Sequence, residues 1–134
     1  MKIPKGAIVV VADGEILKLF RNDGEDFAPK LEVLPDTAIS KENKGSGGRH
    51  QSSSANPSDS QQEEDSFAAG MAAMLNKRVL DGKIENLIIV AAPRTLGELR
   101  IHYHKALSAI LIGEIAKDLT GHSVADIEKS IAAA

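Results

Sequence analysis

One short polar segment combines glycine, arginine, histidine and glutamine in a pattern suited to contacting another molecule. The segment is Gly47, Gly48, Arg49, His50 and Gln51. Two adjacent glycines let the backbone approach a partner closely, in conformations that are closed to other residues. The arginine and the histidine add local positive charge, which suits the phosphate groups of a nucleic acid. The alternative interpretation is a flexible linker with incidental charges.

A second basic pattern lies in the C-terminal half. Arg94 follows the apolar run of residues 86–92 and a proline. Arg100 comes about two helical turns later. If the run forms a buried strand, Arg94 stands at its carboxyl end, where open α/β sheets bind ligands. Alternatively, both arginines cover apolar surface and pair with acids such as Glu98 or Asp118. The sequence leaves these interpretations open.

Other chemistries find little support. The chain has no cysteine, which excludes disulfides, thiolate nucleophiles and cysteine-ligated metals. His102 and His104 would lie on different sides of a helix, so we interpret them as surface or helix-end residues. The serines at 52–54 lack the Gly-x-Ser-x-Gly pattern of a hydrolase. A two-metal nuclease would need Asp13 and the acids at 63–65 to converge, and the later apolar run ends without an acid. We therefore expect no metal and no cofactor.

Composition bounds the class of protein. The chain has 134 residues, of which 43% are hydrophobic, so we expect one domain over residues 1–134. A net charge of −3 argues against broad binding to nucleic acid or anionic membrane, but allows a local basic patch. No apolar run approaches the roughly 20 residues of a membrane-spanning helix. The run at 7–12 is too short for a signal peptide. We expect a cytoplasmic protein without membrane contact.

Hydrophobic periodicity predicts the elements that would position these residues. Apolar or alternating runs predict strands at residues 7–12, 15–21, 30–34, 86–92 and 109–115. Helical spacing predicts helices at residues 61–81, 95–107 and 123–131. The last strand could instead continue the preceding helix, but its isoleucines and glycine favour a strand. The polar stretch at about 36–60 is expected to be a flexible loop.

The order of these elements predicts an α/β fold. The two fully apolar strands should lie centrally and pair in parallel, because a helix connects them. The three N-terminal strands then extend the sheet on one side, and the last strand extends it on the other. The prediction is a mixed five-stranded sheet of order 3-2-1-4-5, with strand 2 antiparallel and helices on both faces. This is the ribonuclease H-like arrangement.

Motifs spread over nearly the whole chain resemble those of the bacterial host-attachment protein family ("protein required for attachment to host cells"). In chain order they are Val11-Ala12-Asp13-Gly14, Leu19-Phe20-Arg21, Gly47-Gly48-Arg49-His50, Phe67-Ala68, Ala91-Ala92-Pro93-Arg94, Leu96-Gly97-x-Leu99-Arg100 and Lys117-Asp118-Leu119-Thr120. That family is in turn similar to the middle domain of archaeo-eukaryotic peptide-chain release factors. The resemblance implies the same ribonuclease H-like order.

The resemblance also implies a role for the glycine-rich segment. In the release factors, the loop after the third strand carries Gly-Gly-Gln, which reaches the ester of peptidyl-tRNA. Gly47 and Gly48 fall in the corresponding loop, but Arg49 follows them and Gln51 comes two positions late. Arginine suits phosphate, so the resemblance implies contact with RNA or the ribosome more than ester hydrolysis.

Together these observations predict a non-enzymatic module that contacts the ribosome or tRNA. The candidate contact residues are Gly47, Gly48, Arg49, His50, Arg94 and Arg100. Two alternatives stay open. One is an attachment factor that works through protein partners, and the other is a hydrolase of ester-linked RNA.

Overall fold

Five strands form one mixed sheet in the computed structural model, which describes residues 1–35 and 57–134. The strands are β1 (Ile8–Ala12), β2 (Leu17–Asn22), β3 (Leu31–Val33), β4 (Leu87–Ala91) and β5 (Leu111–Ala116). Their order is β3-β2-β1-β4-β5. Strand β2 is antiparallel to both of its neighbours, and β4 is parallel to β1 and β5. The order and the directions predicted from the sequence are confirmed.

The central position of β1 and β4 follows from their composition. Every residue of β4 is buried, and so are the last four residues of β1. The parallel pairing runs from Ile8 opposite Leu87 to Ala12 opposite Ala91. Because neighbouring side chains of a strand point to opposite faces, each of these strands supplies apolar residues to both sides of the sheet.

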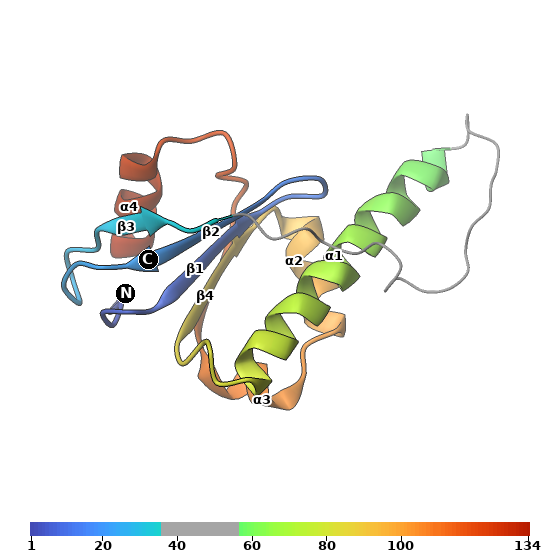
Figure 1. The fold of residues 1–134 in the computed structure, drawn as a ribbon. Helices are drawn as coiled ribbons and strands as arrows, with labels where there is room; N and C mark the ends of the chain where they lie inside the picture. The colour runs from blue at the N-terminus through green and yellow to red at the C-terminus, as the bar shows by residue number, and fades with distance from the viewer. Residues whose placement is uncertain (36–56) are drawn as a thin grey trace.

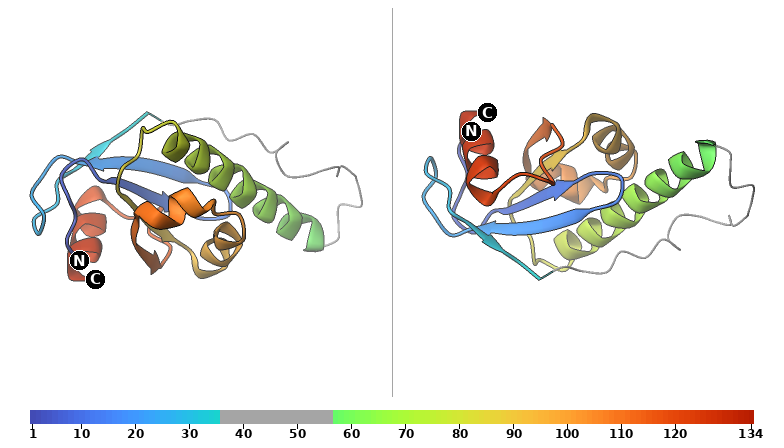
Figure 2. Two further views of the ribbon diagram at one scale, coloured as in Figure 1. Left: turned by 90° about the horizontal axis from the view of Figure 1, so that it is seen from below. Right: turned by 90° about the horizontal axis from the view of Figure 1, so that it is seen from above.

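Helices cover both faces of the sheet (Figures 1 and 2). On one face lie α1 (Pro57–Leu80), α2 (Pro93–Ile101) and α3 (Lys105–Ile110). On the other face lies α4 (Val124–Ala133). None of the helices in the described part of the chain is long and apolar enough to cross a membrane.

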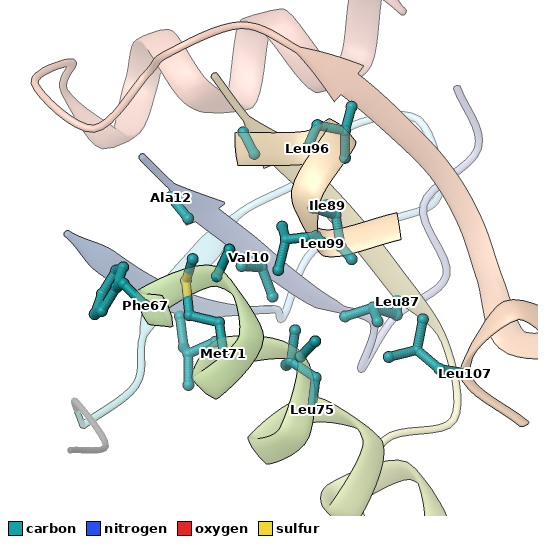
Figure 3. Close-up of a cluster of buried hydrophobic side chains, with 14 of the residues drawn as sticks. Val10, Ala12, Phe67, Met71, Leu75, Leu87, Ile89, Leu96, Leu99 and Leu107 are labelled. Atoms are coloured by element: carbon teal, nitrogen blue, oxygen red, sulfur yellow. The ribbon is translucent and has the colours of Figure 1, made fainter. Parts of the chain in front are cut away.

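Each face has its own apolar core. Figure 3 shows the larger one, in which residues of α1, α2 and α3 pack on β1 and β4. Its labelled members are Val10, Ala12, Phe67, Met71, Leu75, Leu87, Ile89, Leu96, Leu99 and Leu107. The smaller core joins α4 to the opposite face through Ile127 and Ile131, which pack with Val9, Val11 and Val90. Helix α2 is therefore held firmly against the sheet, which matters for the residues at its N-terminus.

The helix predicted over 95–107 is two helices, because the chain breaks between them. The side chain of Asn76, on α1, binds both sides of the break: its Nδ2 donates to the carbonyl of His102 at 2.9 Å, and its Oδ1 accepts from the amide of His104 at 2.9 Å. His104 then caps α3, because its Nδ1 accepts from the amide of Ala106. The prediction of histidines at helix ends is confirmed.

The ends of helices α1 and α4 lie closer to the positions predicted from the sequence. Helix α1 begins at Pro57, four residues earlier than predicted. It ends at Leu80, and Gly82 in the turn that follows has a φ of +78°, which suits glycine. The amide of Lys83 donates to the carbonyl of Arg78 at 2.9 Å and closes the end of the helix. Helix α4 has the predicted cap, since the side chain of Ser123 accepts from the amide of Asp126.

Candidate functional site

The carboxyl ends of the parallel strands bring several polar residues to one edge of the sheet. Asp13 follows β1, Arg94 stands in the first turn of the helix after β4, and Asp118 comes shortly after β5. Parallel strands end at the same edge, and open α/β sheets bind their ligands there. We call this region the carboxyl edge and consider its residues in turn.

Thr120 ties two loops of the carboxyl edge together. Its hydroxyl oxygen lies 2.8 Å from Oδ1 of Asp118 and 3.1 Å from Oδ2 of Asp13. The single hydroxyl proton serves one of these carboxylates at a time. The Nζ of Lys18 donates to the carbonyl of Thr120 at 2.6 Å. Thr120 is only 7% exposed, so these contacts form a fixed floor for the edge.

The acids of the carboxyl edge already have structural roles. Oδ1 of Asp13 accepts from the amides of Glu15 and Ile16, at 2.8 and 2.7 Å, and so holds the turn between β1 and β2. Glu64 of α1 lies against Gly14 in the same turn, where a Cβ would meet its Cδ at 2.6 Å. Among the described residues, no group of three or more histidines or acids is arranged to hold a metal ion.

Arg94 is an exposed cation of the carboxyl edge. Its side chain is exposed, and it makes no hydrogen bond or ion pair within residues 1–35 and 57–134. It stands at the start of α2, whose N-cap is Ala92, a residue without a capping side chain. The first amide that reaches back to Ala92 is that of Leu96. The amides of Arg94 and Thr95 thus find no acceptor among the described residues, and both belong to the positive end of the helix dipole.

The side chain of Thr95 is buried, and its hydroxyl has no hydrogen-bond partner among the described residues. Thr95 is 7% exposed, and in the part of the chain that the structure describes its side chain makes no hydrogen bond. Side chains of a helix lean toward its N-terminus, so this hydroxyl leans toward the same end as the unpaired amides. A buried hydroxyl without a partner costs about 1–3 kcal/mol. The sequence analysis did not select Thr95, because the absence of a partner is visible only in the folded chain.

Arg100 does not join Arg94. It lies near the other end of α2, where its Nη2 and Nε donate to Oε1 of Glu114 at 2.7 and 3.0 Å. Tyr103 donates its hydroxyl to the other oxygen of Glu114 at 2.8 Å. Arg100 thus pairs with an acid, but the acid is Glu114 of β5 and neither Glu98 nor Asp118. Glu98 instead lies 3.4 Å from His102.

The electrostatics of this cluster follow from the same contacts. Partial burial acts to raise the pKa of Glu114, but the hydrogen bonds from Arg100 and Tyr103 outweigh it and hold the pKa below its ordinary value. Burial raises the pKa of Tyr103, and the hydrogen bond to Glu114 raises it further. The hydrogen bond to Glu114 also raises the pKa of Arg100. The cluster thus joins α2 and the break after it to β5.

Gly47, Gly48, Arg49 and His50 lie outside the described residues. Of the candidate contact residues, the structure therefore places Arg94 and Arg100. It adds Thr95 and the unpaired amides at the start of α2.

Fold and site together define a ribonuclease H-like α/β domain whose carboxyl edge presents hydrogen-bond donors that have no partner within residues 1–35 and 57–134. A family model, that of Bacterial archaeo-eukaryotic release factor family 12, matches residues 6–131 of the chain. The chain belongs to this family, which confirms the likeness to release factors that the sequence motifs indicated. A search of curated proteins finds no match.

Proposed function

We propose that this protein is a non-catalytic module of translation that contacts ribosomal RNA or tRNA through phosphate groups, in the cytoplasm. The observation that carries the proposal is the start of α2, where the exposed Arg94 stands beside two amides and the buried hydroxyl of Thr95, none of which has a partner among the described residues. All of these groups can donate hydrogen bonds, and one carries a positive charge. Phosphate accepts hydrogen bonds, carries negative charge and binds at helix N-termini.

The acids nearby do not cancel this preference. Oδ1 of Asp13 accepts from the amides of Glu15 and Ile16, Oδ1 of Asp118 accepts from the amide of Thr120, and the hydroxyl proton of Thr120 serves one of the two carboxylates at a time. Lys18 adds a positive charge to the same floor. These contacts hold Asp13 and Asp118 in place, while Arg94 makes no hydrogen bond or ion pair within residues 1–35 and 57–134 and keeps its donors for a ligand.

Membership in a release-factor family supports RNA as the source of the phosphate. The matched region, residues 6–131, includes Gly47, Gly48, Arg49 and His50. In this proposal the two glycines allow close approach to the RNA backbone, and Arg49 and His50 supply further contacts to phosphate. Arg100 is a secondary candidate, because Glu114 already neutralises its charge.

Co-sedimentation with ribosomes in a sucrose gradient tests the proposal. We expect the wild type to travel with ribosomes, and Arg94→Ala and a Gly47→Ala/Gly48→Ala/Arg49→Ala variant to stay near the top. Lys77→Ala is the matched control, since it removes an exposed charge that is paired only within α1, with Asp81. It should sediment like the wild type.

Salt dependence gives a second measurement on tRNA and rRNA fragments. The loss of one phosphate contact in Arg94→Ala should reduce the slope of log K against log salt by roughly 0.7–0.9. A wild type that binds neither ribosomes nor RNA refutes the proposal and favours an attachment factor that works through protein partners. Turnover of aminoacyl-tRNA that depends on Arg49, His50 or Gln51 would refute the non-catalytic part and favour the hydrolase.

A further inference from the structure

A second site lies at the amino edge of the sheet, opposite the carboxyl edge. A cavity of about 250 Å³ opens beside the start of β1 and the turn between α1 and β4. Its apolar lining comes from Ile8, Leu19, Leu34 and Ile84. Leu19 and Ile84 belong to the core under α1, and Ile8 and Leu34 pack against that core. The cavity is therefore an extension of the apolar interior that reaches the surface.

Three cations also line this cavity, and none of its lining residues in the described part of the chain is an acid. They are Arg21 of β2, Arg78 in the last turn of α1 and Lys83 in the turn that follows. Arg21 lies opposite Ile8 in the pairing of β1 with β2. Its Nε donates to Asp23 at 2.9 Å, and its two terminal nitrogens remain as donors. Lys83 makes no ion pair or side-chain hydrogen bond within the described ranges.

Helix C-termini carry partial negative charge on their last carbonyls, which would repel an anion. At the end of α1, two of these carbonyls are already occupied by hydrogen bonds. The carbonyls of Arg78 and Val79 accept from the amides of Lys83 and Gly82, at 2.9 and 3.0 Å. These closing bonds satisfy the last carbonyls of the helix. They also fix Arg78 and Lys83 next to each other at the cavity.

We propose that this cavity binds a small amphipathic anion, a molecule with an apolar body and a single carboxylate or phosphate head. The apolar lining would hold the body, and Lys83 and the terminal nitrogens of Arg21 would receive the head. A cavity of 150 Å³ holds a benzene ring, so the space here suits a body of about ten heavy atoms. The proposal does not rest on RNA contact, because the cavity shares no residue with the carboxyl edge.

Titration followed by amide resonances in nuclear magnetic resonance tests the inference. The probes are octanoate, octyl phosphate, octanol and acetate. Octanoate and octyl phosphate show which head is preferred, octanol lacks the charge, and acetate lacks the body. We expect saturable shifts at Gly6 and Ile84 with one or both amphipathic anions, about tenfold weaker binding of octanol, and none of acetate.

Variants separate the charge from the space. Lys83→Met should weaken binding of the amphipathic anion about tenfold, and Leu34→Trp, which fills the cavity, should abolish it. Lys77→Met, in the same last turn of α1 but outside the lining, should bind like the wild type. Octanol binding as tightly as the anions, unchanged binding by Lys83→Met, or shifts confined to other regions would each overturn the inference. Ribosome sedimentation reports separately on the carboxyl edge.

Discussion

Replacement of Thr95 by valine should make the protein more stable and its contact with RNA weaker. Valine has nearly the same shape as threonine but carries a methyl group in place of the hydroxyl. Thr95 is 7% exposed, and its hydroxyl makes no hydrogen bond in the described part of the chain. Within the described residues, the wild type therefore bears the cost of a buried polar group that a ligand would relieve.

The size of the effect follows from two contributions. Removing a buried hydroxyl without a partner recovers about 1–3 kcal/mol, and burying a methyl adds about 0.8 kcal/mol. Threonine and valine have nearly equal helix propensities, so the backbone contributes little. Allowing for imperfect packing of the new methyl, we expect Thr95→Val to raise the free energy of unfolding by about 1–2 kcal/mol.

Thr120 provides a matched comparison, because it is also 7% exposed but its hydroxyl contacts Asp13 and Asp118. Thr120→Val should lower the free energy of unfolding by about 1–3 kcal/mol, since it leaves both carboxylates without this donor. Urea denaturation measures both variants, with equal slopes expected. The affinity for RNA, measured by filter binding, should fall about threefold to tenfold in Thr95→Val, as expected for one lost hydrogen bond.

A loss of 1 kcal/mol or more in the free energy of unfolding of Thr95→Val would contradict the prediction of greater stability. That result would mean that the hydroxyl already has a partner in the free protein. Greater stability with unchanged RNA affinity would refute the role of Thr95 in phosphate contact, while leaving Arg94 to be judged by its own variant.

Further predictions concern the elements that position the site. Leu99→Ala, at a fully buried position of α2, should cost about 3 kcal/mol in urea denaturation, and a cost below 1 kcal/mol would show that this helix is not held by its core contacts. Gly82→Ala should cost about 1–2 kcal/mol, because alanine is strained at a φ of +78°, and an equal midpoint would contradict this. The carboxylate of Glu114, whose pKa is lowered in the folded protein, stabilises the fold above the pKa of the unfolded chain, and this stabilisation is lost as pH falls through the folded value. Glu114→Gln should therefore be less stable than wild type at pH 7 and converge with it in acid, and a constant difference in denaturation across pH would speak against the pair with Arg100.

The sheet could be predicted from the sequence because the local composition of its central strands identifies them. β-branched runs free of polar residues, such as that of β1, suit strands buried on both faces, and the helix between β1 and β4 requires them to be parallel. The break between α2 and α3 could not be predicted, because it depends on Asn76, which reaches His102 and His104 from another helix. The local pattern there favours a continuous helix.

In the candidate site too, residues defined by local sequence could be predicted, and residues defined by tertiary contacts could not. Arg94 could be found from the sequence, because its place at the end of a predicted central strand is a local property. Thr95 could not, because what distinguishes it is a missing partner. To predict the pairing of Arg100 with Glu114, one must know that β5 lies beside β4, and the predicted strand order gives this. One must also know the register and the directions of the side chains, and the strand order does not give these.

The parallel pairing of β1 with β4 has a consequence for how the chain folds. Ile8 lies opposite Leu87, so this contact closes a loop of roughly 80 residues before the centre of the sheet exists. The hairpin of β1 with β2 and the helical hairpins can form locally, but neither apolar core is complete until that loop closes. We therefore expect the pairing of these two strands to limit the rate of folding. The entropy of closure grows only with the logarithm of loop length, by about 0.6 kcal/mol for each doubling, so the fold tolerates wide variation in the length of the segment between β3 and α1.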